Sequence, residues 1–297
     1  MHKTLSRSRQ FYTRFATVVF LAPAFFFLLV YIVYSTFDAF RLSLYEWNGI
    51  DPQMTFLGLK NWAELLNDAI FFKAFQHNII IIVLSIVIQL PIAMALAVLL
   101  DYGGKKLNFL KVSYYIPSLL SSVAVGILFR YVYEPRAGFI TTISKLFGGP
   151  TVNLLGSSQN SLYAVFAVIC WTAIPFYMVY FLAGLSGLSY EVYEASIIDG
   201  ATRTRYFFSI ALPLLKPIVK SAAVLSMIGS LKYFDLIYVM TEGGPNNASD
   251  LMATYMYRTA FRYMKLGYGS TVASAMFIII TSFSLVVLLL INRRVDD

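Results

Sequence analysis

The 297-residue chain is 59% hydrophobic and only 13% charged, and its mean hydropathy is +0.70. A soluble domain of this size carries roughly twice that charged fraction, so the composition excludes a soluble globular protein and predicts an all-α integral membrane protein. A net charge of +8 would suggest nucleic-acid binding in a soluble protein, but here basic residues that hold helix ends in the cytoplasm explain it. One cysteine and two histidines exclude an internal disulfide and a Cys/His metal site.

The N-terminal region has basic residues before an apolar stretch, the arrangement found in both signal peptides and membrane anchors. Residues 15–37 carry no charge and are numerous enough to cross a bilayer, which needs roughly 20 residues. No small-residue cleavage site follows them. We therefore expect an uncleaved anchor helix.

Further charge-free windows predict four more spans, at 74–100, at 112–129, within 146–190, and at 266–292. An odd number of spans would place the two termini on opposite sides, yet both ends of the chain are basic, which favours the cytoplasm for each. A sixth span is therefore needed, and 210–240 is the candidate. It is apolar but is interrupted by Lys216, Lys220, Lys232 and Asp235.

With six spans, the predicted cytoplasmic segments are 1–14, 101–112, 187–205 and 293–297. Their density of Lys and Arg is about twofold higher than that of the predicted outer segments, as the positive-inside rule requires. Both termini and the polar segment 187–205 are thus expected in the cytoplasm.

The polar segment is predicted to form a helix–turn–helix. Glu191 and Glu194 open a short helix, and Asp199-Gly200 ends it, because glycine permits the left-handed conformation that closes a helix. A second helical run leads to Pro213, which suits the entrance to a membrane helix. On these features alone, an ordinary amphipathic loop between two spans remains an equal alternative.

The same segment carries a family pattern: Glu-Ala-Ala, three residues, Gly, nine residues, Ile-x-Leu-Pro. It stands here as Glu194-Ala195-Ser196, Gly200 and Ile210-Ala-Leu212-Pro213, with Ser196 in place of the second alanine. The chain thereby resembles the permease subunits of binding-protein-dependent ABC importers, which have a type I, MetI-like fold. Ser189, where carbohydrate permeases often have proline, is a second small departure.

Other stretches extend the resemblance over nearly the whole chain and make it most specific from about 160 to 292. They are Asn61-Trp62, Asn78, Tyr233–Pro245, Leu251–Phe261 and Gly267–Ser270. They are similar to carbohydrate importers of the first-permease type, such as MalF and the glycerol-3-phosphate permeases, without the large extracytoplasmic insertion of MalF.

The resemblance implies a subunit of the bacterial or archaeal cytoplasmic membrane that works with a second permease, two ATPase subunits and an extracytoplasmic solute-binding protein. It implies that the polar segment docks on the ATPase through Glu191, Glu194, Ala195, Asp199, Gly200 and Arg203. It also implies that this chain has no catalytic residue and no cofactor of its own. The lack of a Gly-x-x-x-x-Gly-Lys-Ser/Thr run is consistent with ATP and magnesium being bound by a partner.

The resemblance further implies a substrate path beside the fifth span, at Ser226, Gly229, Ser230 and Tyr233, with Thr172 and Phe176 from the fourth. Spacings of three, four and seven put the first set on one helical face, and hydroxyls with an aromatic ring suit a sugar. Close packing of helices through small residues is the alternative. Lys232 could attract an anionic substrate or pair with Asp235, and we expect the pair.

The expected organisation is an N-terminal region 1–73, a permease core 74–292 and a tail 293–297. The function that the resemblance favours is ATP-driven import of a sugar, oligosaccharide or polyol, and glycerol-3-phosphate or glycerophosphodiester import is the alternative. An ion-coupled secondary transporter would usually show inverted repeats and an acidic residue in mid-membrane, and neither is visible. A membrane enzyme is disfavoured because no paired carboxylates or histidines stand at the span ends.

Overall fold

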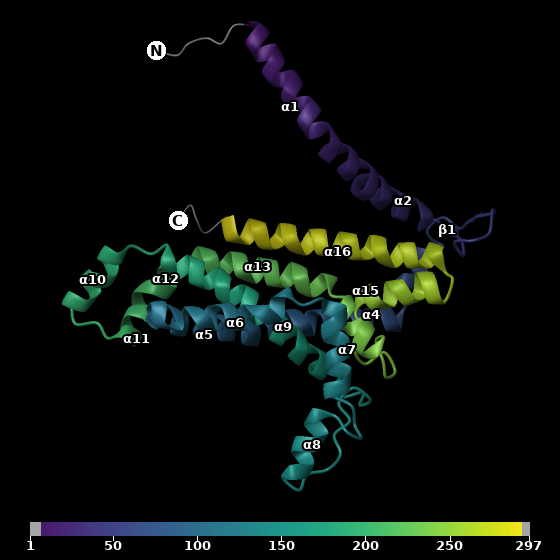
Figure 1. The fold of residues 1–297 in the computed structure, drawn as a ribbon. Helices are drawn as coiled ribbons and strands as arrows, with labels where there is room; N and C mark the ends of the chain where they lie inside the picture. Colours follow the sequence, from purple (N-terminus) through teal and green to yellow (C-terminus); the bar gives the residue numbers. More distant parts are fainter. Residues whose placement is uncertain (1–6, 293–297) are drawn as a thin grey trace. The chain divides into compact units, whose positions relative to one another are not determined.

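The computed structural model describes residues 7–292, which form helices almost throughout (Figure 1). They divide into two compact units: one contains the chain up to Asn67 together with Arg258–Ala275, and the other contains Asp68–Tyr257 together with the chain from Met276. This division joins residues 258–275 to the N-terminal segment. The predicted tail 293–297 and residues 1–6 lie outside the described residues.

The first unit begins with a continuous helix made of α1 (Arg7–Phe27), the π-helical turn η1 (Leu28–Tyr34) and α2 (Ser35–Leu42). Phe15–Leu42 is long and apolar enough to cross a membrane, and none of its most apolar stretch is buried against the rest of the chain. A helix is the conformation that satisfies every backbone group within hydrocarbon. Its apolar surface is therefore available to lipid or to another subunit.

The rest of the first unit is a small polar assembly. It contains β1 (Tyr45–Glu46), β2 (Thr55–Phe56), α3 (Lys60–Leu65), η5 (Arg258–Arg262) and the start of α16 (Leu266–Asn292). The strands pair antiparallel, with Tyr45 opposite Phe56. The buried Asn61 amide donates to the carbonyl oxygens of Ser43 and Tyr45 at 2.9 and 3.0 Å, which fixes α3 against the chain that leads into β1.

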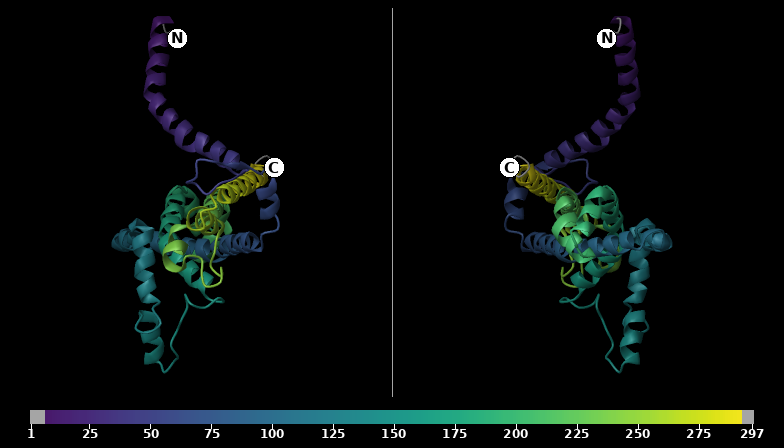
Figure 2. Two further views of the ribbon diagram at one scale, coloured as in Figure 1. Left: turned by 90° about the vertical axis from the view of Figure 1, so that its right-hand side faces the viewer. Right: turned by 90° about the vertical axis from the view of Figure 1, so that its left-hand side faces the viewer.

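The second unit is a helical bundle around α9 (Ser161–Ser186), which packs against α5, α6, α13 and α14. Its other helices before α9 are α4 (Ala69–Leu84), η2 (Ser85–Gln89), α5 (Leu90–Tyr102), η3 (Gly104–Leu107), α6 (Asn108–Leu119), α7 (Ser122–Val132) and α8 (Phe139–Leu146). Those after it are α10 (Tyr190–Ile198), α11 (Arg203–Tyr206), η4 (Phe207–Ala211), α12 (Leu212–Leu214), α13 (Lys216–Lys232), α14 (Asp235–Thr241) and α15 (Met252–Tyr257). Figure 2 shows α7 and α8, in teal, projecting from the remaining helices of this unit.

Two apolar clusters line opposite halves of α9. In one, Val165 and Ile169 pack with buried side chains of α4, α7 and α14. In the other, Met178 and Phe181 pack with α5 and α13, whose contributions include Ala93, Ala97 and Ala222. Small residues at these positions let helices approach closely, which is how helices associate where lipid removes the hydrophobic driving force.

Four helices within residues 7–292 are long and apolar enough to cross a membrane: Phe15–Leu42, Ala69–Tyr102, Ser161–Ser186 and Leu266–Val287. Two bent pairs bring the number to six if each pair is one span. Neither 112–129 nor 210–240 is the continuous helix that was expected. Leu120 and Ser121 adopt extended angles between α6 and α7, which lie at 94°. The other pair bends by 69° before α13, which ends at Lys232.

Candidate functional site

The first turn of α10 is capped by its own sequence. The Ser189 hydroxyl accepts a hydrogen bond from the backbone N–H of Glu191 at 3.2 Å. Glu191 lies in the first turn, where a carboxylate interacts favourably with the positive end of the helix dipole. The helix therefore begins where the sequence predicted.

Gly200 closes α10 as predicted, with φ of +79°. The backbone N–H groups of Gly200 and Ala201 donate to the carbonyl oxygens of Ile197 and Ser196, both at 2.9 Å, which satisfies the free end of the helix. A side chain at position 200 would meet no atom within 4 Å, so its cost would come from backbone strain alone. The Thr202 hydroxyl then caps α11 by accepting from the Arg205 N–H at 3.3 Å.

Most side chains of the α10–α11 segment (Tyr190–Tyr206) face outward, and α10 and α11 lie at one end of the second unit in Figure 1. Six predicted ATPase-contact residues are all exposed: Glu191, Glu194, Ala195, Asp199, Gly200 and Arg203. Ile198 between them is 85% exposed, an apolar group on a polar surface. By contrast Ser196, the departure from the family pattern, is buried, and its hydroxyl donates to the Tyr193 carbonyl at 2.6 Å.

An aromatic clamp, formed by Tyr102, Tyr193, Arg203 and Tyr206, ties this segment to the end of α5. The Tyr102 hydroxyl donates to the Arg203 carbonyl at 3.1 Å, and the Arg203 guanidinium lies 5.5 Å from the centre of the Tyr102 ring. Within the segment, the Tyr193 and Tyr206 rings meet edge to face at 5.0 Å. Sequence reasoning missed Tyr102, because its partner lies 101 positions away.

The predicted substrate-path serines, Ser226 and Ser230, are both buried, and the Ser230 hydroxyl is hydrogen-bonded. Ser230 is 1% exposed, and its hydroxyl donates to the Ser226 carbonyl at 2.8 Å. The Asn78 amide of α4 donates to the Ser230 carbonyl at 2.8 Å and accepts from the Met252 N–H at 3.0 Å. A single buried side chain thus caps both the C-terminus of α13 and the N-terminus of α15.

The other predicted path residues differ in accessibility. A side chain built at Gly229 would meet nothing within 4 Å, so this part of α13 faces open space in the single chain. Phe176 is 45% exposed, and its ring stacks on Tyr180, whose hydroxyl bonds to Ser221 of α13 at 2.8 Å. Tyr233 packs against the apolar cluster, and the Thr172 hydroxyl is satisfied within α9.

The expected pairing of Lys232 with Asp235 is wrong. The prediction assumed one continuous helix, but α13 ends at Lys232 and the backbone is extended at Tyr233, so the two side chains do not lie on one face. The Asp235 carboxylate accepts instead from the Ser122 hydroxyl at 3.0 Å. Lys232 is exposed. Among residues 7–292, no group of three or more His, Cys, Asp or Glu side chains could hold a metal ion.

Comparison with known proteins shows which family this chain belongs to. Residues 89–297 match the family profile of the binding-protein-dependent transport system inner membrane component. The chain is 31% identical to the probable ABC transporter permease protein YurN of Bacillus subtilis, over 90% of this chain and 92% of that one. It is also 31% identical to the trehalose/maltose transport system permease protein MalF of Thermococcus litoralis, over 88% of each.

The fold is shared with a solved bacterial ABC transporter that imports the acidic polysaccharide alginate. The TM-score is 0.84 at 18% identity, covering 96% of this chain and 98% of the other. The exposed segment with its Glu-Ala-Ser-x-x-x-Gly pattern lies inside the region that the family profile matches. The chain therefore belongs to the inner membrane components of binding-protein-dependent transport systems, and it is a multi-pass permease subunit of an ABC importer.

Proposed function

We propose that this permease moves a sugar, an oligosaccharide or a related polyol across the cytoplasmic membrane by alternating access. It does so as one half of a pair with a second permease, on which two ATPase subunits and an extracytoplasmic solute-binding protein assemble. Both termini and the α10–α11 segment lie in the cytoplasm, as the distribution of Lys and Arg indicates. The similarity to the trehalose/maltose permease of Thermococcus litoralis, over 88% of each chain, supports the substrate class.

The observation that carries the proposal is the α10–α11 segment itself. Its helix is capped at both ends by its own residues, so it is preformed, yet Glu191, Glu194 and Asp199 remain exposed. A preformed polar helix suits a partner surface better than a flexible loop, because less conformational entropy is lost on binding. Closure of the ATPase dimer would move this helix as a rigid element and bias the transmembrane helices between two states.

Purification of the tagged chain tests the assembly. We expect an ATPase and a second permease to copurify with it, and ATP-dependent uptake once the complex is reconstituted with a ligand-loaded solute-binding protein. Removing α10 contacts with the double substitution Glu191→Ala and Glu194→Ala should release the ATPase while the permeases remain paired. Uptake by this chain alone in liposomes, driven by an ion gradient, would contradict the proposal.

We propose the substrate path along α13 and α9, at Ser226, Gly229, Ser230, Tyr233, Thr172 and Phe176. The accessibility of Gly229 and Phe176 supports it, while the buried Ser230 would act mainly by holding α13 in place. Photocrosslinking from position 176 to a sugar probe tests this placement. A crosslink to lipid alone would remove Phe176 from the path.

A second candidate substrate is an anionic one, such as a glycerophosphate or an acidic sugar. The exposed Lys232 ammonium, which forms no ion pair with Asp235, favours it. In the reconstituted complex, Lys232→Gln should lower the rate at which acidic substrates are transported and leave the transport rate of neutral sugars unchanged. Equal effects on both classes of substrate would show that Lys232 does not select substrates by their charge.

A further inference from the structure

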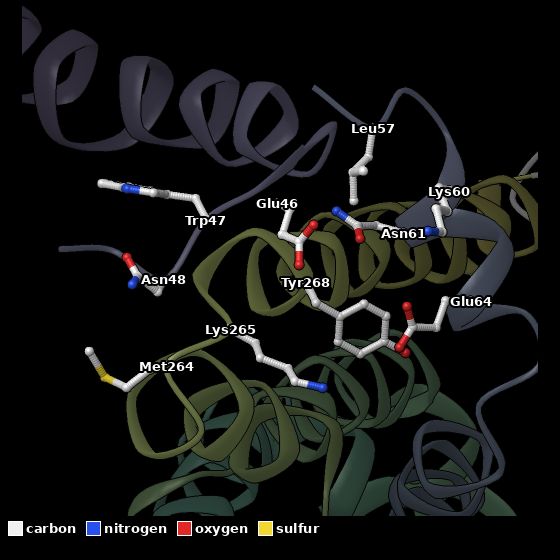
Figure 3. A pocket seen from close by; sticks show the side chains of 10 residues that line it. All are labelled: Glu46, Trp47, Asn48, Leu57, Lys60, Asn61, Glu64, Met264, Lys265 and Tyr268. Atoms are coloured by element: carbon white, nitrogen blue, oxygen red, sulfur yellow. The ribbon is translucent and has the colours of Figure 1, made fainter. Parts of the chain in front are cut away.

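A polar pocket lies within the first unit, where three segments distant in the sequence meet (Figure 3). The chain just after Tyr45, helix α3 and the residues that begin α16 line it. The charged and aromatic side chains of its lining are Glu46, Trp47, Lys60, Glu64, Lys265 and Tyr268. Figure 3 shows the Tyr268 ring between the side chains of Lys265 and Glu64.

The walls of the pocket are fixed by backbone contacts. The Gly267 N–H donates to the Trp47 carbonyl at 3.0 Å. A side chain at position 267 would come within 2.0 Å of the Tyr45 carbonyl oxygen, so only glycine permits this approach. The Trp47 indole N–H donates to the Asp51 carbonyl at 2.8 Å, which holds its ring at the rim. The pocket is therefore preformed, which favours binding because little has to be ordered.

Its charged groups are not neutralised by the chain. Glu46, Lys60, Glu64 and Lys265 form no ion pair with any residue between 7 and 292. They supply two carboxylates and two ammonium groups around one concavity. A ligand of a single charge sign would meet repulsion from half of them, whereas a surface that carries both signs can pair with each.

The size of the pocket limits what it can hold. Its volume is about 220 Å³, below the roughly 300–1,000 Å³ typical of small-molecule sites. That space accommodates one or two protein side chains and is too small to enclose an oligosaccharide. Its size and its mixed charges together suit the tip of a protein loop better than a transported sugar.

We propose that this pocket receives a polar loop of the solute-binding protein, carrying one basic and one acidic side chain. The inference rests on the proposed function, because the distribution of Lys and Arg places residues 38–73 and 241–265 outside the cytoplasm. The pocket thereby fixes the register of the binding protein on this subunit through the paired charges.

Cysteine labelling tests the proposal in the assembled transporter, because the one native cysteine, Cys170, is buried. Lys60→Cys should react with a membrane-impermeant maleimide in intact cells stripped of binding protein, and Ile198→Cys on α10 should not. Adding the solute-binding protein that copurifies with the transporter should slow labelling at position 60 at least fivefold. Protection by free maltose alone would identify a sugar site and overturn the proposal.

Two failures are distinguishable in this experiment. Labelling at position 198 but not at 60 from outside would refute the proposed orientation. Labelling at 60 that the binding protein leaves unchanged would refute only the pocket, with the proposed function intact.

Charge reversal gives an independent measurement with the complex in nanodiscs. Glu64→Lys and Lys265→Glu should each raise the Kd for the binding protein about tenfold, with the effect diminishing at high salt. Lys145→Glu on α8, an exposed lysine outside the pocket, is the matched control and should leave the Kd unchanged. Equal weakening by Lys145→Glu would show nonspecific attraction and overturn the proposal.

Discussion

The α10–α11 segment exposes its polar side chains, whereas the polar side chains between α4, α13 and α15 are buried and bonded to neighbouring helices. Glu191, Glu194 and Asp199 leave their charges open to a partner. The Asn78 amide connects three helices, because it donates to the Ser230 carbonyl of α13 and accepts from the Met252 N–H of α15. Polar residues in a membrane protein thus serve either recognition or architecture, and residue type alone does not separate the two uses.

The largest expected effect comes from breaking the buried network. Asn78→Leu removes the caps of α13 and α15 and leaves a buried carbonyl and N–H without partners, at a cost of about 2–4 kcal/mol. The thermal unfolding temperature of the purified complex should fall clearly. Asn67→Leu, at an exposed asparagine, should change it little. An unchanged unfolding temperature for Asn78→Leu would show that the network is not structural.

The next largest effect concerns the turn of the exposed segment. Gly200→Val forces a β-branched residue into the left-handed region, at about 1–2 kcal/mol or more, and should lower substrate-stimulated ATPase activity several-fold. Gly200→Asn adds a side chain of similar reach but tolerates the same backbone angles, so it should retain most of the stimulation. Equal losses in both variants would point to steric exclusion by the ATPase instead of strain.

The aromatic clamp joins the exposed segment to the bundle, and its removal should have an intermediate effect. Tyr102→Phe loses the hydrogen bond to the Arg203 carbonyl but keeps the ring under the guanidinium, while Tyr102→Leu loses both contacts. Each contact contributes about 0.5–1.5 kcal/mol. The ratio of transport to ATP hydrolysis should fall stepwise from wild type to Phe to Leu. If only basal hydrolysis changed, the clamp would have no part in coupling.

The smallest expected effects distinguish a residue that faces the substrate path from one that packs helices together. Gly229→Ala adds one methyl group where α13 faces open space, and it should raise the KM for transport about twofold with no change in unfolding temperature. Ser230→Ala should instead lower stability slightly, by less than about 1.5 kcal/mol, and leave the KM unchanged. The reverse pattern would show that the Ser230 hydroxyl contacts the substrate directly and that Gly229 serves packing.

The sequence predicts the local features of the molecule well. Gly200 was expected to end the short helix that Glu191 and Glu194 open, and it does so with a positive φ. Charge counting also finds the apolar segments. It does not reveal the helix breaks at Leu120–Ser121 and at Tyr233, because no proline or glycine stands at either position.

The same limit explains the mistaken Lys232 pair and the missed contacts of Tyr102 and Asn78. Helical spacing predicts contacts only along an unbroken helix, and α13 ends where the pair would begin. Tyr102 and Arg203 meet only once the bundle has formed. The role of Asn78 could have been predicted from the sequence. It is an amide within an apolar stretch, and a buried amide needs a hydrogen-bond partner.

The length of α4–η2–α5 has a mechanical consequence. Ala69–Tyr102 is a helical rod of 34 residues, about 50 Å long, and it exceeds a hydrocarbon layer of roughly 30 Å. One end is anchored by Asp68, whose carboxylate accepts from the Tyr255 hydroxyl, and the other carries Tyr102. Tilting such a rod by about 5° moves its far end by roughly 4 Å, less than one helical turn. We therefore expect a small rotation imposed on the α10–α11 segment, which contacts Tyr102, to reach the Asp68 end of this rod as a displacement of several ångströms.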